Sequence, residues 1–187
     1  MENEKRPYVC PAEFAGTLDN PIRRLIHNPR KILTPYITRG MTVIDLGCGP
    51  GYFTIGLAKL VGEEGKVIAA DLQQGMLDKV VRKIGGTDLE QRIEIHKCQD
   101  DRIGVSEKVD FVLAFWMVHE VPDQQSMFEE LISILKPGGR ICIIEPKFHV
   151  TEKSFSRMIV LSETAGFKII ERPKVCLSRA VLFVRNT

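Results

Sequence analysis

From Met41 onward, short runs of apolar and β-branched residues alternate with segments in which apolar residues recur every three or four positions. The first pattern is typical of buried strands and the second of amphipathic helices. The expected strands are 42–46, 66–70, 93–96, 109–115, 140–144, 167–171 and 180–184. The expected helices are 52–61, 73–84, 152–165 and one that opens at Pro122-Asp123, whose apolar face is Met127, Phe128, Leu131, Ile134 and Leu135.

This alternation of strand and helix predicts an α/β protein with an open, largely parallel sheet that helices cover on both faces. The last two strands are joined only by residues 172–179, too few for a helical crossover, so we expect them to pair antiparallel.

A glycine-rich turn follows the first expected strand and leads directly into a helix. Gly47, Gly49 and Gly51 allow a tight turn and a close approach of the backbone to a ligand. A dinucleotide-binding turn has the spacing G-x-G-x-x-G, and Tyr52 stands here where its third glycine is expected. Asp45, just before the turn, would repel a pyrophosphate but suits a cationic group, so the turn favours a ligand that carries an amino acid.

The run Val43-Ile-Asp-Leu-Gly-Cys-Gly-Pro-Gly51 resembles motif I of the class I S-adenosylmethionine-dependent methyltransferases. The resemblance covers about residues 40–187 and is nearest to the small-molecule branch that includes ubiquinone and menaquinone methyltransferases. It implies a Rossmann-like seven-stranded sheet of order 3-2-1-4-5-7-6 with S-adenosylmethionine as cofactor. The implied cofactor-binding residues of this turn are Asp45, Gly47, Cys48, Gly49 and Gly51.

Further cofactor contacts are implied at the ends of the next strands. Asp71 closes the second strand and would bind the ribose hydroxyls, although it also suits the N-cap of the following helix. Asp100, or its neighbour Asp101, would accept from the adenine amino group, unless the pair forms only a polar turn. By position alone, Leu72 and Ile103 would pack on the adenine, and Ala114, in the fourth strand, would also contact the cofactor.

His119 follows the fourth strand, where members of the family often carry a histidine near the transferred methyl group. It is the candidate catalytic residue because histidine takes up a proton near neutral pH, although a structural histidine is the competing interpretation. Glu145, at the end of the fifth strand, either faces the acceptor or caps the strand.

Length, net charge and cysteine content limit the number of domains, the partners and the compartment that we expect. The 187 residues are of single-domain size, and the net charge of +2 does not by itself indicate nucleic acid or membrane as a partner. We expect a cytoplasmic protein, because no signal peptide or apolar span is visible and the five cysteines lack paired spacing. No metal is expected. Arsenic-binding members of the family hold the metalloid with several cysteines, and Cys10 with Cys142 or Cys176 is the candidate set for such a site here.

Residues 1–40 stand outside the alternation, and we expect them to cover the ligand edge of the core at 41–187. Asn20-Pro21 and Asn28-Pro29 each predict a helix start, and Pro35 should bend or shorten the second helix. Acceptor choice is expected in this segment and in the loops after the fourth and fifth strands. The candidate acceptor-pocket residues in the segment are Tyr8, Glu13, Arg23, Arg24 and His27.

The expected reaction is an in-line transfer of a methyl group to a small-molecule acceptor, with orientation and exclusion of water as the main tasks of the protein. Two alternatives remain at this point: a non-catalytic cofactor-binding subunit of a partner enzyme, and a nicotinamide-dependent oxidoreductase. The sequence does not determine the oligomeric state.

Overall fold

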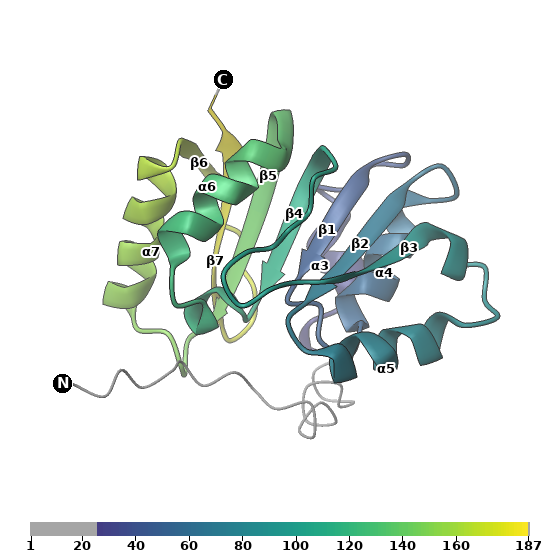
Figure 1. Cartoon of the computed structure of the whole chain (residues 1–187). Coiled ribbons are helices and arrows are strands. Elements are labelled where there is room, and N and C mark those ends of the chain that lie inside the picture. The colour runs from purple at the N-terminus through teal and green to yellow at the C-terminus, as the bar shows by residue number, and fades with distance from the viewer. Residues whose placement is uncertain (1–25, 187) are drawn as a thin grey trace.

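The computed structural model describes residues 26–186 and forms one seven-stranded sheet with helices on both sides (Figure 1). The sheet order is β3-β2-β1-β4-β5-β7-β6, as expected. The strands are β1 (Thr42–Leu46), β2 (Lys66–Asp71), β3 (Ile93–Lys97), β4 (Val109–Phe115), β5 (Leu135–Pro146), β6 (Phe167–Glu171) and β7 (Ser178–Arg185). The helices are α3 (Pro29–Leu33), α4 (Tyr52–Val61), α5 (Gln74–Ile84), α6 (Gln124–Ile134) and α7 (Glu152–Thr164), with short 3-10 turns η2 (Glu90–Arg92) and η3 (Val118–Glu120).

The parallel strands carry the apolar runs that the sequence shows. β1 lies between β2 and β4, and all three are parallel, with Ile44 beside both Ile68 and Val112. Such strands are covered on both faces, which requires apolar residues at successive positions rather than at alternate ones. Because the strands point the same way, their carboxyl ends meet at one edge of the sheet.

The antiparallel end of the sheet confirms the argument from the short 172–179 connection. β7 pairs antiparallel with both β5 and β6. The pairing places Glu145 of β5 beside Arg179 of β7.

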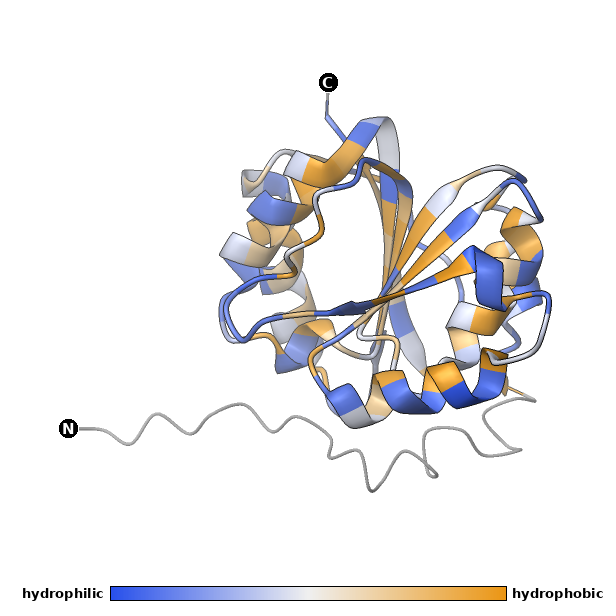
Figure 2. Cartoon of the chain, turned by 45° about the vertical axis from the view of Figure 1, so that its right-hand side comes forward, coloured by the Kyte–Doolittle hydropathy of each residue, from blue (hydrophilic) through white to orange (hydrophobic). Residues whose placement is uncertain are grey.

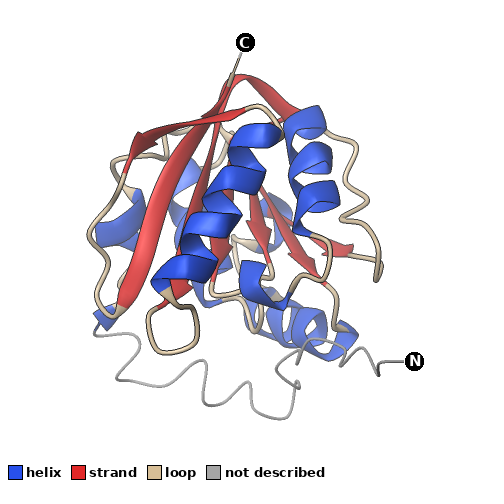
Figure 3. Cartoon of the chain, turned by 90° about the vertical axis from the view of Figure 1, so that its left-hand side faces the viewer, coloured by secondary structure: helices blue, strands red, loops and turns tan. Residues whose placement is uncertain are grey.

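Two apolar clusters, one on each face, hold the layers together. One joins the sheet to α3, α4 and α5, and the other joins it to α6 and α7. Figure 3 shows the sheet between these helices, and in Figure 2 the strands are mainly hydrophobic while α5 is mixed, with polar residues along it. Neighbouring residues of one strand serve opposite clusters, as Val43 and Ile44 do.

The first described helix follows its sequence signals. The side chain of Asn28 accepts a hydrogen bond from the Lys31 amide, Pro29 is the first helical residue, and α3 ends at Leu33, before Pro35. The expected helix at Asn20-Pro21 and the candidates Tyr8, Glu13, Arg23 and Arg24 lie outside the described residues. The expectation that residues 1–40 cover the ligand edge therefore stays a prediction.

β5 begins earlier than expected. The expected strand starts at residue 140, but residues 136–139 already lie within β5, which pairs at Leu135 with Val109 before the register shifts to Arg140 beside Phe111. Gly138, at φ +73°, accommodates the extra residues. Among residues 26–186, no helix combines the length and the apolar character needed to span a membrane.

The contact between α3 and α4 gives a stability test at Gly56. A Cβ added at Gly56 would lie 2.5 Å from the Cβ of Pro29, well inside contact distance. Replacing a mid-helix glycine with alanine normally stabilises by about 0.5–1 kcal/mol. Here we expect Gly56→Ala to lower the free energy of unfolding by about 1–3 kcal/mol, because the core is overpacked.

Urea denaturation of the Gly56→Ala, Pro29→Gly and double variants measures this coupling. In the Pro29→Gly background, Gly56→Ala should become neutral or stabilising. An equal cost in both backgrounds would show that the contact is not the cause.

Candidate functional site

The carboxyl ends of the parallel strands surround a cavity of about 970 Å³. Its wall comes from the turns after β1, β2 and β3, from the segment after β4 and from the end of β5. The lining residues are 45–50, 52, 53, 71–73, 76, 98–103, 115–117, 119–123, 127, 130, 146, 148 and 149. This is the position at which open parallel sheets bind their ligands.

The glycine turn is shaped by contacts that exclude side chains. The amides of Gly47 and Cys48 donate to the carbonyl of Ala70, at 2.8 and 3.1 Å, and hold the turn against the end of β2. A Cβ at Gly47, which has φ +67°, would lie 2.7 Å from the Cβ of Met117. Gly49, at φ +53°, has no heavy atom within 4 Å of its Cβ position, so its backbone is open to a ligand.

Asp71 connects the turns after β1 and β2. One carboxylate oxygen accepts from the Gly49 amide and the other from the Gln73 amide, each at 2.8 Å. Burial raises the pKa of Asp71, although these two amides oppose the rise. A carboxylate oxygen accepts more than one hydrogen bond, so both oxygens retain capacity for hydroxyl groups of a ligand.

Asp45, at the end of β1, is also buried, with 2% of its surface exposed. It accepts a hydrogen bond of 2.6 Å from the Thr54 hydroxyl of α4 and lines the cavity beside the glycine turn. The structure therefore brings Asp45, Gly47, Cys48, Gly49 and Asp71 to one wall.

The candidate adenine-binding residues line a neighbouring part of the cavity. Leu72, Asp100, Asp101 and Ile103 are all in its wall, and the two aspartates are exposed. Glu130 of α6 accepts from the amides of Ile103 and Gly104, at 2.8 and 2.6 Å, and so fixes the loop. No local pattern in the sequence marks Glu130, because its partners Ile103 and Gly104 lie 27 and 26 positions away.

Gly51 and Ala114 are placed differently from the other candidates and are not in the cavity wall. Gly51 is the N-cap of α4 at φ +84°, and its Cβ position is 3.0 Å from Val80 of α5. Ala114 is fully buried in β4 beside Leu46 and Ile143. Both residues support the site through packing.

His119 lines the cavity and is paired with the buried Glu145 of β5. Nδ1 of His119 lies 2.5 Å from one carboxylate oxygen of Glu145, and the other oxygen accepts from the Val118 amide at 2.8 Å. Glu145 is 1% exposed. Burial alone would lower the pKa of His119, but the hydrogen bond and negative charge of Glu145, with the charge of Glu120, raise it above its ordinary value.

An aromatic wall lies beside this pair, made by Tyr52, Phe53, Phe115, Trp116 and Phe148, which all line the cavity. Trp116 has φ +59°, a conformation that is uncommon outside glycine and marks a constrained site. Its indole N–H donates to the Ser178 hydroxyl at 3.0 Å, and its ring meets Phe148 edge-on, with centroids 5.3 Å apart.

His27, a candidate from the front segment, is buried behind this wall and is not part of the lining. Its ring packs edge-on against Phe115 and Trp116. Its Nε2 lies 2.8 Å from the carbonyl oxygen of Cys176.

The cysteines do not form a ligand set within the described residues. Cys48 and Cys98 line the cavity, and burial raises the pKa of both thiols, to about 12 for Cys98. Cys142 is buried in β5, Cys176 is exposed, and Cys10 lies outside the described residues. Within residues 26–186, no three His, Cys, Asp or Glu side chains are grouped so as to hold a metal ion.

Comparison with known proteins identifies the family. A model described as a methyltransferase domain matches residues 37–174. A demethylmenaquinone methyltransferase of Lactobacillus johnsonii is 34% identical over 134 residues, which are 71% of this chain and 53% of that protein. One from Oceanobacillus iheyensis is 31% identical over 109 residues, or 58% of this chain and 46% of that protein. The chain thus spans about half the length of the curated relatives it matches.

Solved structures show the same fold over nearly the whole chain. A SAM-dependent methyltransferase from Aquifex aeolicus superposes with a TM-score of 0.86 at 28% identity, covering 95% of this chain and 100% of that one. A putative S-adenosylmethionine-dependent methyltransferase from Methanococcus maripaludis gives a TM-score of 0.77 at 20% identity, covering 100% and 97%. The chain belongs to the class I S-adenosylmethionine-dependent methyltransferases and resembles their menaquinone-type members.

Proposed function

We propose that the chain transfers a methyl group from S-adenosylmethionine to a small, flat and mainly apolar acceptor. The observation that carries this proposal is the joining of two parts in one cavity. One part is the glycine turn with Asp71, and the other is the aromatic wall with the His119–Glu145 pair.

The donor half of the cavity has groups that match each part of the cofactor. Asp71 would hold the ribose hydroxyls, the glycine turn and Asp45 would receive the methionine portion, and Asp100 or Asp101 would accept from the adenine amino group. Bound there, S-adenosylmethionine supplies a methyl group made electrophilic by its sulfonium. Arg102 is the single arginine or lysine in the described lining, so the acidic wall favours this cationic ligand.

In the part of the chain that the structure describes, the acceptor half is aromatic and its lining holds no lysine or arginine that would bind an anionic substrate. Trp116 and Phe148 offer flat apolar faces, and ring systems stack well against such side chains. The curated relatives are named for demethylmenaquinone, which supports a flat ring compound as the acceptor; the nucleophile would be a reduced, hydroxylated ring, because an oxidised quinone is electron-poor. Because the chain spans about half of those relatives, the proposal stays at the class of the acceptor.

His119 would take the proton that the acceptor loses on methylation. With Nδ1–H donating to Glu145, the neutral ring presents its Nε2 lone pair as the base. The buried carboxylate then stabilises the imidazolium that forms. The acceptor atom bonds to the methyl carbon, the carbon–sulfur bond breaks, and S-adenosylhomocysteine leaves.

Donor binding should depend on Asp71. We expect Asp71→Ala to weaken S-adenosylmethionine binding by about 1–3 kcal/mol, the cost of losing charged hydrogen bonds. Isothermal titration measures the difference. Asp78→Ala, which removes a carboxylate of α5 outside the cavity, is the matched control and should bind like the unaltered chain. Equal affinity in all three proteins would show that Asp71 does not contribute to donor binding.

His119→Ala should reduce methyl transfer to a hydroxylated aromatic acceptor while leaving donor affinity unchanged. General base catalysis contributes roughly 10²–10⁴-fold, which sets the size of the expected fall in kcat. Acceptor methylation and donor titration are measured on the same preparation. Normal donor binding without transfer by the unaltered chain to any acceptor tested would favour a cofactor-binding subunit instead.

The pH dependence tests the pair itself. Activity should rise as pH increases through the pKa of His119, because only the neutral ring accepts a proton. Glu145 raises that pKa, so Glu145→Gln should move the rising limb to lower pH and reduce the maximal rate. A rate profile measured across neutral pH decides this. If Glu145→Gln leaves the rising limb of the profile at the same pH, His119 is not the group whose titration sets that limb.

A further inference from the structure

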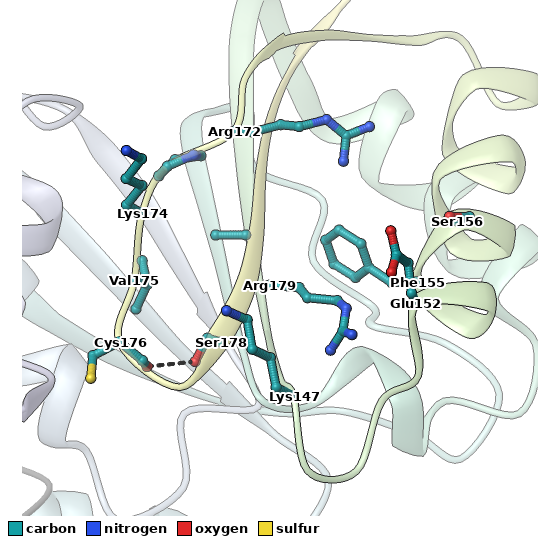
Figure 4. A pocket seen from close by; sticks show the side chains of 12 residues that line it. Lys147, Glu152, Phe155, Ser156, Arg172, Lys174, Val175, Cys176, Ser178 and Arg179 are labelled. Carbon is teal, nitrogen blue, oxygen red and sulfur yellow. Dashed lines mark hydrogen bonds between the residues drawn. The ribbon is translucent and has the colours of Figure 1, made fainter.

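A second pocket, of about 600 Å³, lies beside the antiparallel end of the sheet (Figure 4). Its wall is formed by Lys147 just after β5, the first turns of α7, the connection at 172–177 and the start of β7. Among the described residues, Glu152 is the only acidic residue in the lining. Four cationic side chains line the pocket: Lys147, Arg172, Lys174 and Arg179. No step of the proposed methyl transfer uses this pocket.

Positive charge exceeds negative charge in the described lining of this pocket, with four cationic side chains against Glu152. Among residues 26–186, none of these four side chains forms an ion pair. Arg179 donates one hydrogen bond, of 2.9 Å, to the carbonyl of Val150 and keeps further N–H groups. The described lining of the donor cavity has the opposite character, with several carboxylates and Arg102 as its single arginine or lysine.

The pocket is concave and has an apolar floor. Phe155, Val175 and Ala180 line it and are buried, at 4%, 7% and 6% exposure. Figure 4 shows the side chains of Arg172 and Arg179 above and below the Phe155 ring. Two guanidinium groups beside a low-polarity surface favour an anion that accepts several hydrogen bonds at once.

We propose that this pocket binds a phosphate-bearing ligand. A phosphate group presents several acceptor oxygens, which match the planar N–H forks of Arg172 and Arg179, while Lys147 adds a mobile point charge. Its apolar floor has room for a carbon skeleton attached to the phosphate. This inference is independent of the methyl-transfer proposal.

The pocket is physically connected to the acceptor wall. Ser178 lines the pocket and accepts the indole hydrogen bond of Trp116, and the amide of Lys147 donates to the carbonyl of Leu177 at 3.0 Å. Phe148 and Leu177, next to pocket residues in the chain, are 63% and 54% exposed. The phosphate can therefore belong to a free metabolite or to a lipid headgroup, and the experiment separates the two sources.

The experiment titrates pyrophosphate into the full chain by calorimetry, with saturating S-adenosylhomocysteine present so that the donor cavity is filled. Arg172→Gln removes one pocket cation, and Lys168→Gln removes one exposed cation of β6 outside the pocket as the matched control. In parallel, sedimentation with vesicles of phosphatidylcholine alone, or mixed with phosphatidylglycerol, tests the lipid source. Thermal melting confirms that each variant is folded.

We expect saturable binding in at least one arm that Arg172→Gln weakens about tenfold or more, as for a lost charged hydrogen bond, and that Lys168→Gln leaves within twofold. Binding of pyrophosphate alone would assign a free ligand, and binding of phosphatidylglycerol vesicles alone would assign a headgroup. The proposal is overturned by no binding in either arm at millimolar ligand, or by equal weakening in both variants.

Discussion

The carboxylate of Asp71 and the two amides it accepts from are the interaction on which the donor side depends. It joins the glycine turn after β1 to the turn after β2 through Gly49 and Gln73. Without it, the amides of two adjacent turns would lose their partner in a buried place, where an unmade hydrogen bond costs most. Because Asp71 is itself desolvated, these amides also compensate for its burial.

Buried carboxylates with hydrogen-bond donors also lie near the ends of other strands. Asp45 closes β1 and is held by Thr54, and Glu145 lies near the end of β5 and is held by the Val118 amide and His119. Each buried carboxylate fixes the segment that follows a strand and also faces, or positions a group that faces, the cavity. The parallel arrangement of the strands brings these ends together, so the sheet topology creates the site.

Local signals were sufficient for most of the fold. The apolar runs, the glycine turn and the short 172–179 connection predict the strands, the helices and the antiparallel end, and the structure agrees with them. The start of β5 was predicted too late, at residue 140, because a sequence does not reveal that Leu135 already pairs with Val109.

The sequence indicates cavity-lining positions only where they lie at or shortly after a strand end, as Asp71 and His119 do. Contacts between distant segments left no local pattern. Trp116 bonds Ser178 across 62 positions, and Glu130 fixes Ile103 and Gly104 across 27 and 26. The basic pocket draws on Lys147 just after β5, the 172–177 connection and β7, and its lysines and arginines resemble ordinary surface charges in the sequence.

The segment at the end of β5 contributes residues to both the larger cavity and the basic pocket. Pro146, Phe148 and His149 line the donor and acceptor cavity, whereas Lys147 lines the basic pocket. Because this segment belongs to both walls, one residue inserted or deleted here would displace side chains that line both. The two compartments therefore constrain each other's evolution, and a change of acceptor preference at this segment would have to preserve its length.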